Sequence, residues 1–140
     1  MLLVPHFIAP SPIHGLGCFS SANIKKGKRI WEFHPIIDRI IPQSDLLGLP
    51  DHIVQLVQTH AEFVPDAAIF RLAADGAFFM NHSDDPNLED FGDWMIACRD
   101  IEIGDEITCD YRVVKVWSFP RARQDGVGHS PSGIELVAQK

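Results

Sequence analysis

The chain has 140 residues, which is the size of one domain, and 46% hydrophobic with 22% charged residues is ordinary globular composition. Twelve basic against 19 acidic side chains give a net charge of −7, which argues against the clustered positive charge of nucleic-acid-binding proteins. No apolar run approaches the roughly 18 residues of a membrane span, and the proline-broken start predicts no secretion signal. Three cysteines without a Cys-x-x-Cys pair favour a reducing compartment over a zinc site or a disulfide framework.

The first third of the chain predicts short elements separated by turns. Residues 12–19 form a glycine-punctuated turn. Residues 24–33 turn at Gly27 and continue as a partly buried strand. Residues 36–41 are apolar enough for a further strand, which Pro42 ends.

One clear helix is predicted over residues 50–60. Pro50 suits the first helical position, and Asp51 in the first turn favours the positive end of the helix dipole. Apolar and aromatic side chains then recur with the spacing i, i+3, i+4, i+7, at Ile53, Leu56, Val57 and His60. These four residues are therefore predicted to share the buried face.

The remaining elements are again short. Residues 67–80 are mostly small and apolar, residues 94–98 predict a continuously buried strand, and residues 107–111 predict another short strand. Residues 120–133, rich in glycine and proline, predict a loop-like tail. Many short strands with one clear helix indicate a β-rich single domain.

Three segments concentrate residues with chemical potential. Residues 14–17 (His-Gly-Leu-Gly) let backbone approach a ligand closely, and residues 81–87 (Asn-His-Ser-Asp-Asp-Pro-Asn) carry many short hydrogen-bonding side chains. Residues 104–111 (Gly-Asp-Glu-Ile-Thr-Cys-Asp-Tyr) end in the only tyrosine of a chain with nine phenylalanines. Each segment alone is also typical of a turn or an edge strand, but the single phenol at Tyr111 suggests a specific use for its hydroxyl.

In this order the three segments resemble the motifs of the SET-domain protein-lysine methyltransferases. The likeness spans residues 11–117, and the compact size is similar to that of the minimal viral SET methyltransferase. It implies a mainly β, β-clip-like fold of several small sheets with short helices and a C-terminal pseudoknot, in which residues 81–87 meet residues 107–111. The implied domain covers residues 1–119, and residues 120–140 form a tail that completes or covers the site.

The resemblance also assigns roles to individual residues. Tyr111 matches the catalytic tyrosine, and Phe33 and Cys109 match positions of the substrate channel. No metal is implied, and the implied cofactor is S-adenosylmethionine. The cofactor-binding residues that the resemblance implies are His14, Gly15, Leu16, Gly17, Asn81, His82 and Trp117. Asn87 and Ser83 are expected to satisfy backbone groups at the pseudoknot.

The family chemistry is transfer of a methyl group to the side-chain amine of a lysine in a protein. Two departures affect the channel: Phe33 lacks a hydroxyl that relatives commonly carry, and Cys109 stands where they have phenylalanine or tyrosine. The channel is therefore expected to be less polar than usual, and the number of methyl groups transferred stays open. Beyond the catalytic tyrosine, apolar residues are expected to close the site: Val113, Val114, Val116, Trp117 and Phe119.

The implied partner is a basic protein or peptide, such as a histone tail. We expect the exposed side of the predicted helix to carry Asp51, Gln55 and Gln58. Together with these residues, an acidic rim that could attract a basic peptide is expected at Asp84, Asp85, Glu89, Asp90 and Asp93. We expect no direct nucleic-acid or membrane binding, a possible homodimer, and a cytoplasmic protein, or a nuclear one if it acts on a eukaryotic histone. Two alternatives stay open: a catalytically weak SET-like module that binds cofactor or a basic peptide, and a small β-rich structural protein without a cofactor.

Overall fold

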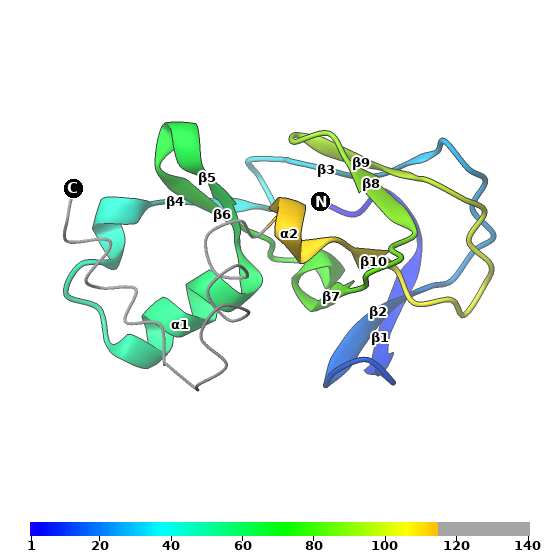
Figure 1. Ribbon diagram of the computed structural model, residues 1–140, viewed down its shortest axis with the longest axis horizontal. Coiled ribbons are helices and arrows are strands. Elements are labelled where there is room, and N and C mark those ends of the chain that lie inside the picture. The colour runs from blue at the N-terminus through cyan, green and yellow to red at the C-terminus, as the bar shows by residue number, and fades with distance from the viewer. Residues whose placement is uncertain (115–140) are drawn as a thin grey trace.

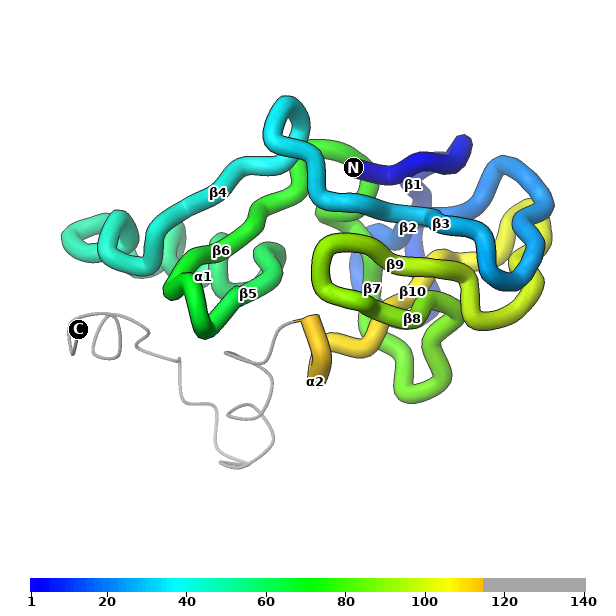
Figure 2. The backbone as a smooth tube through the Cα atoms, turned by 90° about the horizontal axis from the view of Figure 1, so that it is seen from above, coloured from blue at the N-terminus to red at the C-terminus, as the bar shows by residue number. Residues whose placement is uncertain are grey.

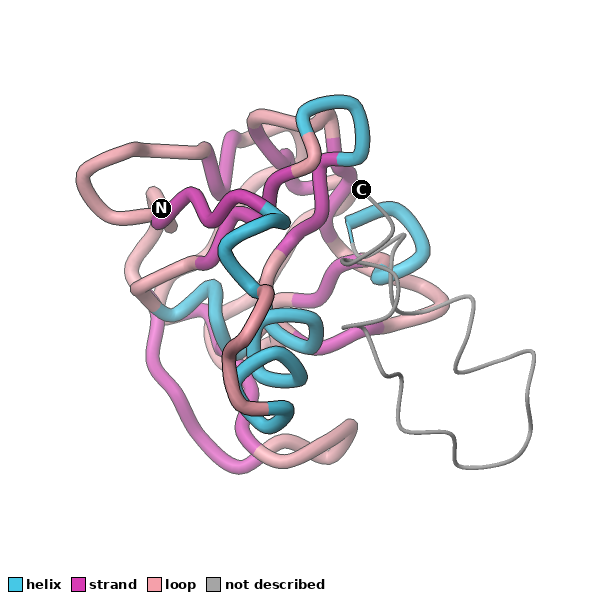
Figure 3. The backbone as a smooth tube through the Cα atoms, turned by 90° about the vertical axis from the view of Figure 1, so that its left-hand side faces the viewer, coloured by secondary structure: helices cyan, strands magenta, loops and turns pink. Residues whose placement is uncertain are grey.

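The computed structural model describes residues 1–114. Short strands and loops make up most of this part, with few helical turns (Figure 3). The strands are β1 (His6–Pro10), β2 (Leu16–Ser20), β3 (Arg29–Glu32), β4 (Arg39–Pro42), β5 (Glu62–Val64), β6 (Ile69–Leu72), β7 (Asn81–His82), β8 (Leu88–Asp90), β9 (Trp94–Ala97) and β10 (Thr108–Cys109). The helices are α1 (Asp51–His60), α2 (Tyr111–Val114) and the 3-10 turns η1 (Gln43–Leu46), η2 (Pro65–Ala67) and η3 (Gly76–Phe79).

The strands form four small sheets, which confirms the expected fold class. β1 and β2 form an antiparallel hairpin, and the orders β3-β9-β8 and β4-β6-β5 describe two antiparallel three-stranded sheets. β7 and β10 form a short parallel pair. The sheet β4-β6-β5 and α1 lie at one end of the molecule, the other strands lie at the opposite end, and α2 lies between them (Figures 1 and 2).

Each end of the molecule has its own hydrophobic core. The larger core includes fully buried isoleucines from four separate segments: Ile24, Ile30, Ile101 and Ile107. The smaller core joins α1 to the sheet β4-β6-β5 through Leu46, Val54, Val57, Ala61 and Phe70. The region between the two cores is therefore where side chains of both ends can meet.

The parallel pair of β7 and β10 brings together two distant segments, as expected from the resemblance. Asn81 lies opposite Thr108, and His82 lies opposite Cys109. Asn87 secures this arrangement, because its Oδ1 accepts a hydrogen bond from the Thr108 backbone N–H at 2.9 Å and its Nδ2 donates to the Glu106 carbonyl at 2.8 Å. The structural role expected of Asn87 is thereby confirmed.

Helix α1 lies where it was predicted, but its buried face is different. Val54, Val57 and Gln58 are buried, whereas Leu56 is exposed. With Ala61 they repeat the same i, i+3, i+4, i+7 spacing one residue further along the chain. The prediction was wrong because Gln58 was taken for an exposed residue, and its burial rotates the packed face by one position.

Two predicted strands differ from those observed because of their surroundings. Backbone N–H groups of residues 37 and 38 donate to the His34 carbonyl and form a turn, so β4 begins only at Arg39. In β9, Met95 and Ala97 are buried while Trp94 is exposed, so the strand alternates instead of being buried throughout. This is the pattern of an antiparallel sheet with one face open to solvent.

The segments that flank the candidate site also differ from their predictions. Gly15, with φ of +48°, ends the predicted turn, and β2 begins at Leu16 because it pairs with β1. β10 stops at Cys109, and Tyr111 begins α2 instead of ending a strand. Val113, expected to pack over the site, is exposed, whereas Val114 is buried in the larger core.

Candidate active site

Tyr111 lies beside the polar segment that begins at β7. Its backbone N–H donates a hydrogen bond to Nδ1 of His82 at 3.1 Å, and its hydroxyl donates to the Met80 carbonyl at 2.6 Å. Burial raises the pKa of the Tyr111 phenol above its ordinary value, so the hydroxyl stays protonated across the physiological range. The phenol is therefore a neutral group with a fixed orientation, whose oxygen can still accept a hydrogen bond.

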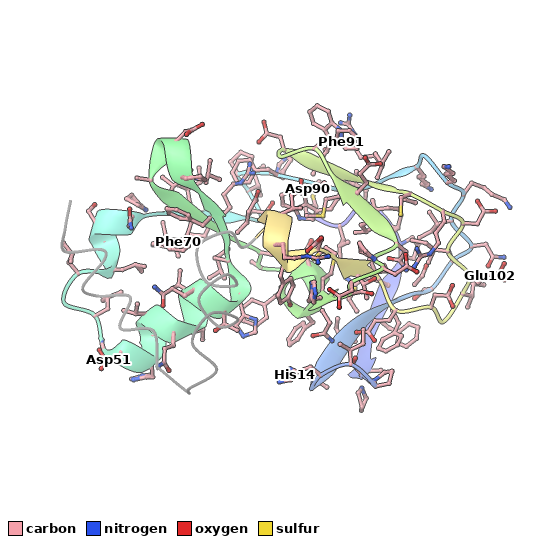
Figure 4. The ribbon with its side chains drawn as sticks, in the orientation of Figure 1. His14, Asp51, Phe70, Asp90, Phe91 and Glu102 are labelled. Carbon is pink, nitrogen blue, oxygen red and sulfur yellow. The ribbon has the colours of Figure 1, made fainter. Side chains whose placement is uncertain are left out.

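Asn81 connects β7 to the glycine loop before β2. Its Nδ2 donates to the carbonyl oxygens of His14 and Leu16 at 3.0 and 3.1 Å, and to Oε1 of Glu106 at 2.8 Å. His14 itself is exposed and lies at the tip of the β1–β2 hairpin (Figure 4). The structure thus holds residues 14–17 against Asn81, whose amide is occupied in holding the loop, whereas His82, the next residue of β7, contacts the backbone of Tyr111.

Glu106 explains why residue 17 is glycine. A Cβ at this position would lie 2.3 Å from Oε1 of Glu106, which also accepts a hydrogen bond from the Ser11 hydroxyl at 2.9 Å. Glu106 was missed as a site residue, although it belongs to the motif of residues 104–111. The glycine at position 17 therefore makes room for this partly buried carboxylate.

A Gly17→Ala substitution is expected to lower the free energy of unfolding by about 1–3 kcal/mol, because the methyl group displaces Glu106 from its hydrogen bonds. Urea denaturation measures the loss. A Glu106→Ala change in the same chain is expected to add much less than it does alone, because the contact that it removes is already broken. Full additivity of the two changes would contradict this explanation.

A cavity of about 50 Å³ lies next to Tyr111, which forms part of its lining. A single water molecule needs only about 10–15 Å³ of such space, so the cavity can take the end of a side chain. Its apolar wall comes mainly from the larger core and consists of Trp31, Ala77, Met80, Met95 and Cys109. Of the two expected channel residues, Cys109 lines this cavity. Phe33 is not among the lining residues and instead contacts Arg71, whose guanidinium lies 5.2 Å from the centre of the Phe33 ring.

Part of the cavity wall is charged, contrary to the expected low polarity of the channel. Glu62 and Arg71 are opposite each other on β5 and β6, and Arg71 donates two hydrogen bonds of 2.9 Å to the Glu62 carboxylate. Asp38 and His60 also line this wall. These residues belong to no sequence motif, so no pattern in the sequence could have singled them out.

Burial raises the pKa of Glu62 to about 7, despite the two hydrogen bonds from Arg71. The neighbouring carboxylates of Asp90 and Asp93 raise it further. Glu62 is consequently a carboxyl group that changes its charge close to neutral pH.

Comparison with protein families agrees with this arrangement. The family model described as the SET domain matches residues 15–112. This chain belongs to the SET-domain family. Trp117, assigned to the cofactor site by the resemblance, lies outside the described residues, as do Val116, Phe119 and the boundary at residue 119.

Several solved structures have folds similar to that of this SET domain. A candidate histone methyltransferase of Plasmodium falciparum has a TM-score of 0.54 at 22% identity, over 79% of this chain and 95% of that one. Neurospora DIM-5, a histone lysine methyltransferase, has 0.55 at 22% identity over 79% and 53%. A humanized mutant of Polycomb Repressive Complex 2 from Chaetomium thermophilum has 0.57 at 17% over 77% and 15%. A search of curated proteins finds no significant match.

Two further observations concern the described part of this SET domain. No helix within residues 1–114 is both long and apolar enough to cross a membrane. In the same residues, no cluster of three or more histidine, cysteine, aspartate or glutamate side chains is placed to hold a metal ion.

Proposed function

We propose that this SET domain is an S-adenosylmethionine-dependent methyltransferase that acts on the side-chain amine of a lysine in a protein. The observation that carries the proposal is the position of the Tyr111 hydroxyl. It is fixed by the Met80 carbonyl between the β7–β10 pair and the cavity that Cys109 lines. The phenol thus lies between the segment that contains His82 and a narrow cavity. This position suits a reaction between two molecules that enter from opposite sides.

The residues present fit the proposed cofactor in two respects. Nothing lies within 4 Å of the position that a Cβ on Gly15 would occupy, so a ligand can approach the backbone of this loop closely. The Glu106 carboxylate lies beside the same loop and complements a ligand that carries positive charge, whereas Asp84 and Asp110 are already paired with Arg112. His14, Gly15, Leu16, Asn81 and His82 would hold the cofactor, which supplies an electrophilic methyl group when bound.

The target amine must lose a proton before its lone pair can react. Deprotonation of a lysine side chain at pH 7 costs roughly 4.6 kcal/mol from its ordinary pKa. The apolar residues Trp31, Met80 and Met95 lower this cost, because burial disfavours the charged form of an amine, whereas the carboxylates that line the same cavity favour that form. The walls of the cavity also limit the orientations of the amine, which lowers the entropy cost of the reaction.

Tyr111 is assigned the role of aligning the amine. Its hydroxyl hydrogen is committed to the Met80 carbonyl, so its oxygen can accept an N–H of the neutral amine and direct the lone pair. Its raised pKa means that the phenol orients the amine but does not remove the proton as a phenolate.

A basic protein is the proposed partner, although the expected acidic rim is partly neutralised. Asp84 lies 3.4 Å from Arg112, and Asp85 lies 3.0 Å from Arg99. On the helix, Asp51 and Gln55 are exposed as expected, whereas Gln58 is buried. The proposed attraction therefore rests mainly on the overall charge of −7 and on the exposed Glu89, because Asp93 is itself paired with Arg71.

The proposal is tested with the full chain, S-adenosylmethionine labelled in its methyl group, and a mixture of core histones and basic bacterial proteins. We expect label on lysine side chains, located by mass spectrometry of the digested proteins. Binding of S-adenosylhomocysteine without any transfer to lysine would instead support the SET-like binding module, for which the missing hydroxyl at Phe33 is the sequence argument.

A Tyr111→Phe variant is expected to lose at least about 100-fold in the rate of transfer, because it keeps the ring and removes the oxygen that aligns the amine. Affinity for S-adenosylhomocysteine, measured by calorimetry, is expected to stay within about threefold of the wild type, since the phenol is assigned no part in holding the cofactor. A folded variant with full turnover would refute the role assigned to Tyr111.

A further inference from the structure

The charged wall of the cavity contains a carboxylate oxygen with no partner. The Asp38 side chain is 1% exposed. Its Oδ2 accepts hydrogen bonds of 2.8 Å from the Met1 ammonium and from the His34 backbone N–H. Its Oδ1 is buried and has no hydrogen-bond partner among the described residues. Such an oxygen is costly to bury unless a donor reaches it.

The charges around the cavity are not balanced. Asp38, Glu62 and Asp93 supply three carboxylates, and they face two cations, the guanidinium of Arg71 and the ammonium of Met1. Arg71 already uses four of its five N–H donors, because it also donates to Asp93 at 2.6 Å and to the Gly92 carbonyl at 3.0 Å. When Glu62 is ionised, above its pKa of about 7, one more positive charge would balance these three carboxylates.

The remaining shape of the cavity suits an alkyl chain that ends in a cation. Trp31, Met80 and Met95 offer apolar surface to methylene groups, whereas Asp38 and Glu62 offer oxygens to the end of the chain. An ammonium group has three donors and no acceptor, which matches a carboxylate wall better than a hydroxyl or amide would.

We propose that Asp38 and Glu62 form an ammonium subsite that receives the target side chain of the substrate in its charged form, next to Tyr111. The inference rests on the proposed function and deepens it. The segment between β3 and β7, which contains Asp38 and Glu62, selects a cationic alkyl side chain before the amine loses its proton. Asp38 and Glu62 bind the charged amine in this scheme, and they supply polarity where the hydroxyl is missing at Phe33.

The subsite can be tested by binding alone, without any methyl transfer. The probe is n-butylammonium, which matches the end of a lysine side chain, and n-butanol is its uncharged analogue of the same length. Binding is followed through the indole N–H resonance of Trp31, which lines the same cavity, in a folded, isotope-labelled full chain at constant ionic strength. We expect a saturable shift with n-butylammonium and at least tenfold weaker binding of n-butanol.

Isosteric variants assign the effect to the carboxylates. Asp38→Asn is expected to weaken n-butylammonium binding at least tenfold, and Glu62→Gln at least threefold, because Arg71 already balances part of the Glu62 charge. Asp100→Asn, which changes an exposed carboxylate paired with Lys25, is the matched control and is expected to bind as the wild type does. If Asp38→Asn does not fold, Glu62→Gln decides the test.

The possible failures can be told apart. No saturable binding, equal binding of n-butanol, or unchanged affinity in the folded carboxylate variants would overturn the subsite, even in a protein that methylates lysine. Charge-selective binding that both variants weaken would establish the subsite, even in a protein that transfers no methyl group and thereby refutes the proposed function.

Discussion

Replacing Arg71 with methionine is expected to lower the free energy of unfolding by about 3–5 kcal/mol at pH 8, because a largely buried carboxylate then loses its cation. The Arg71 side chain is 9% exposed and Glu62 is 15% exposed, so water cannot replace the two lost hydrogen bonds. The second acidic partner, Asp93, is 76% exposed, so breaking its ion pair with Arg71 contributes little to the loss of stability.

The destabilisation caused by Arg71→Met is expected to be smaller at low pH, because the Glu62 carboxyl is then protonated. Because burial raises the pKa of this carboxyl to about 7, Glu62 is protonated at pH 5 and leaves no buried charge when Arg71 is absent. The destabilisation is then expected to shrink to about 1–2 kcal/mol, the cost of the lost hydrogen bonds. Urea denaturation at pH 5 and pH 8 measures both values, and an equal loss at both would contradict the assignment.

The wild type should show the same ionisation. A carboxyl whose pKa is higher in the folded chain than in the unfolded chain keeps a proton that the unfolded chain releases. Its contribution to stability is therefore complete below the ordinary pKa of 4.5 and is lost as the pH rises through about 7. A Glu62→Gln variant is expected to lack this part of the pH dependence.

Two control variants separate this explanation from a general effect of losing a charge. Lys25→Met removes a cation from an exposed pair with Asp100 and is expected to leave the free energy of unfolding nearly unchanged. Adding Glu62→Leu to Arg71→Met is expected to recover much of the loss, since replacing both members of a buried pair with apolar residues removes the unpaired charge.

The arrangement of β7 and β10 was predictable because the motifs in these segments resemble those of the SET domain. Asn81, Asn87 and Tyr111 all belong to segments that the sequence singled out, and their hydrogen bonds connect those same segments. The fold class followed from the same residues. Without that resemblance each segment is also typical of a turn or an edge strand, and nothing in the sequence indicates that the two meet.

The charged wall of the cavity could not be predicted in this way. Asp38 lies in a turn, and Glu62 and Arg71 belong to different strands of the sheet β4-β6-β5. Only the register of that sheet places Glu62 opposite Arg71, and β5 is too short to show the alternating pattern of a strand. The buried face of α1 was missed for a related reason, because tertiary packing buries Gln58.

The second large effect is expected at Asn87, the residue that holds the two halves of the candidate site together. An Asn87→Leu substitution is expected to lower the free energy of unfolding by about 2–5 kcal/mol, because it leaves the Thr108 N–H and the Glu106 carbonyl without partners. Thr108 is buried and Asn87 is 7% exposed, so water has little access to replace either bond. Chemical denaturation measures the loss.

The position of Asn87 also predicts where the damage appears first. The Thr108 N–H belongs to β10, which pairs with β7 and precedes Tyr111, so its hydrogen exchange should accelerate more than that of the sheet β4-β6-β5. Asn23→Leu is the matched control, because Asn23 is an exposed asparagine that accepts one hydrogen bond from the Ile103 N–H. Its cost is expected to stay below about 1 kcal/mol. Equal losses from the two substitutions would mean that the buried asparagine does not hold β10 against β7, and that the alignment of Tyr111 has another origin.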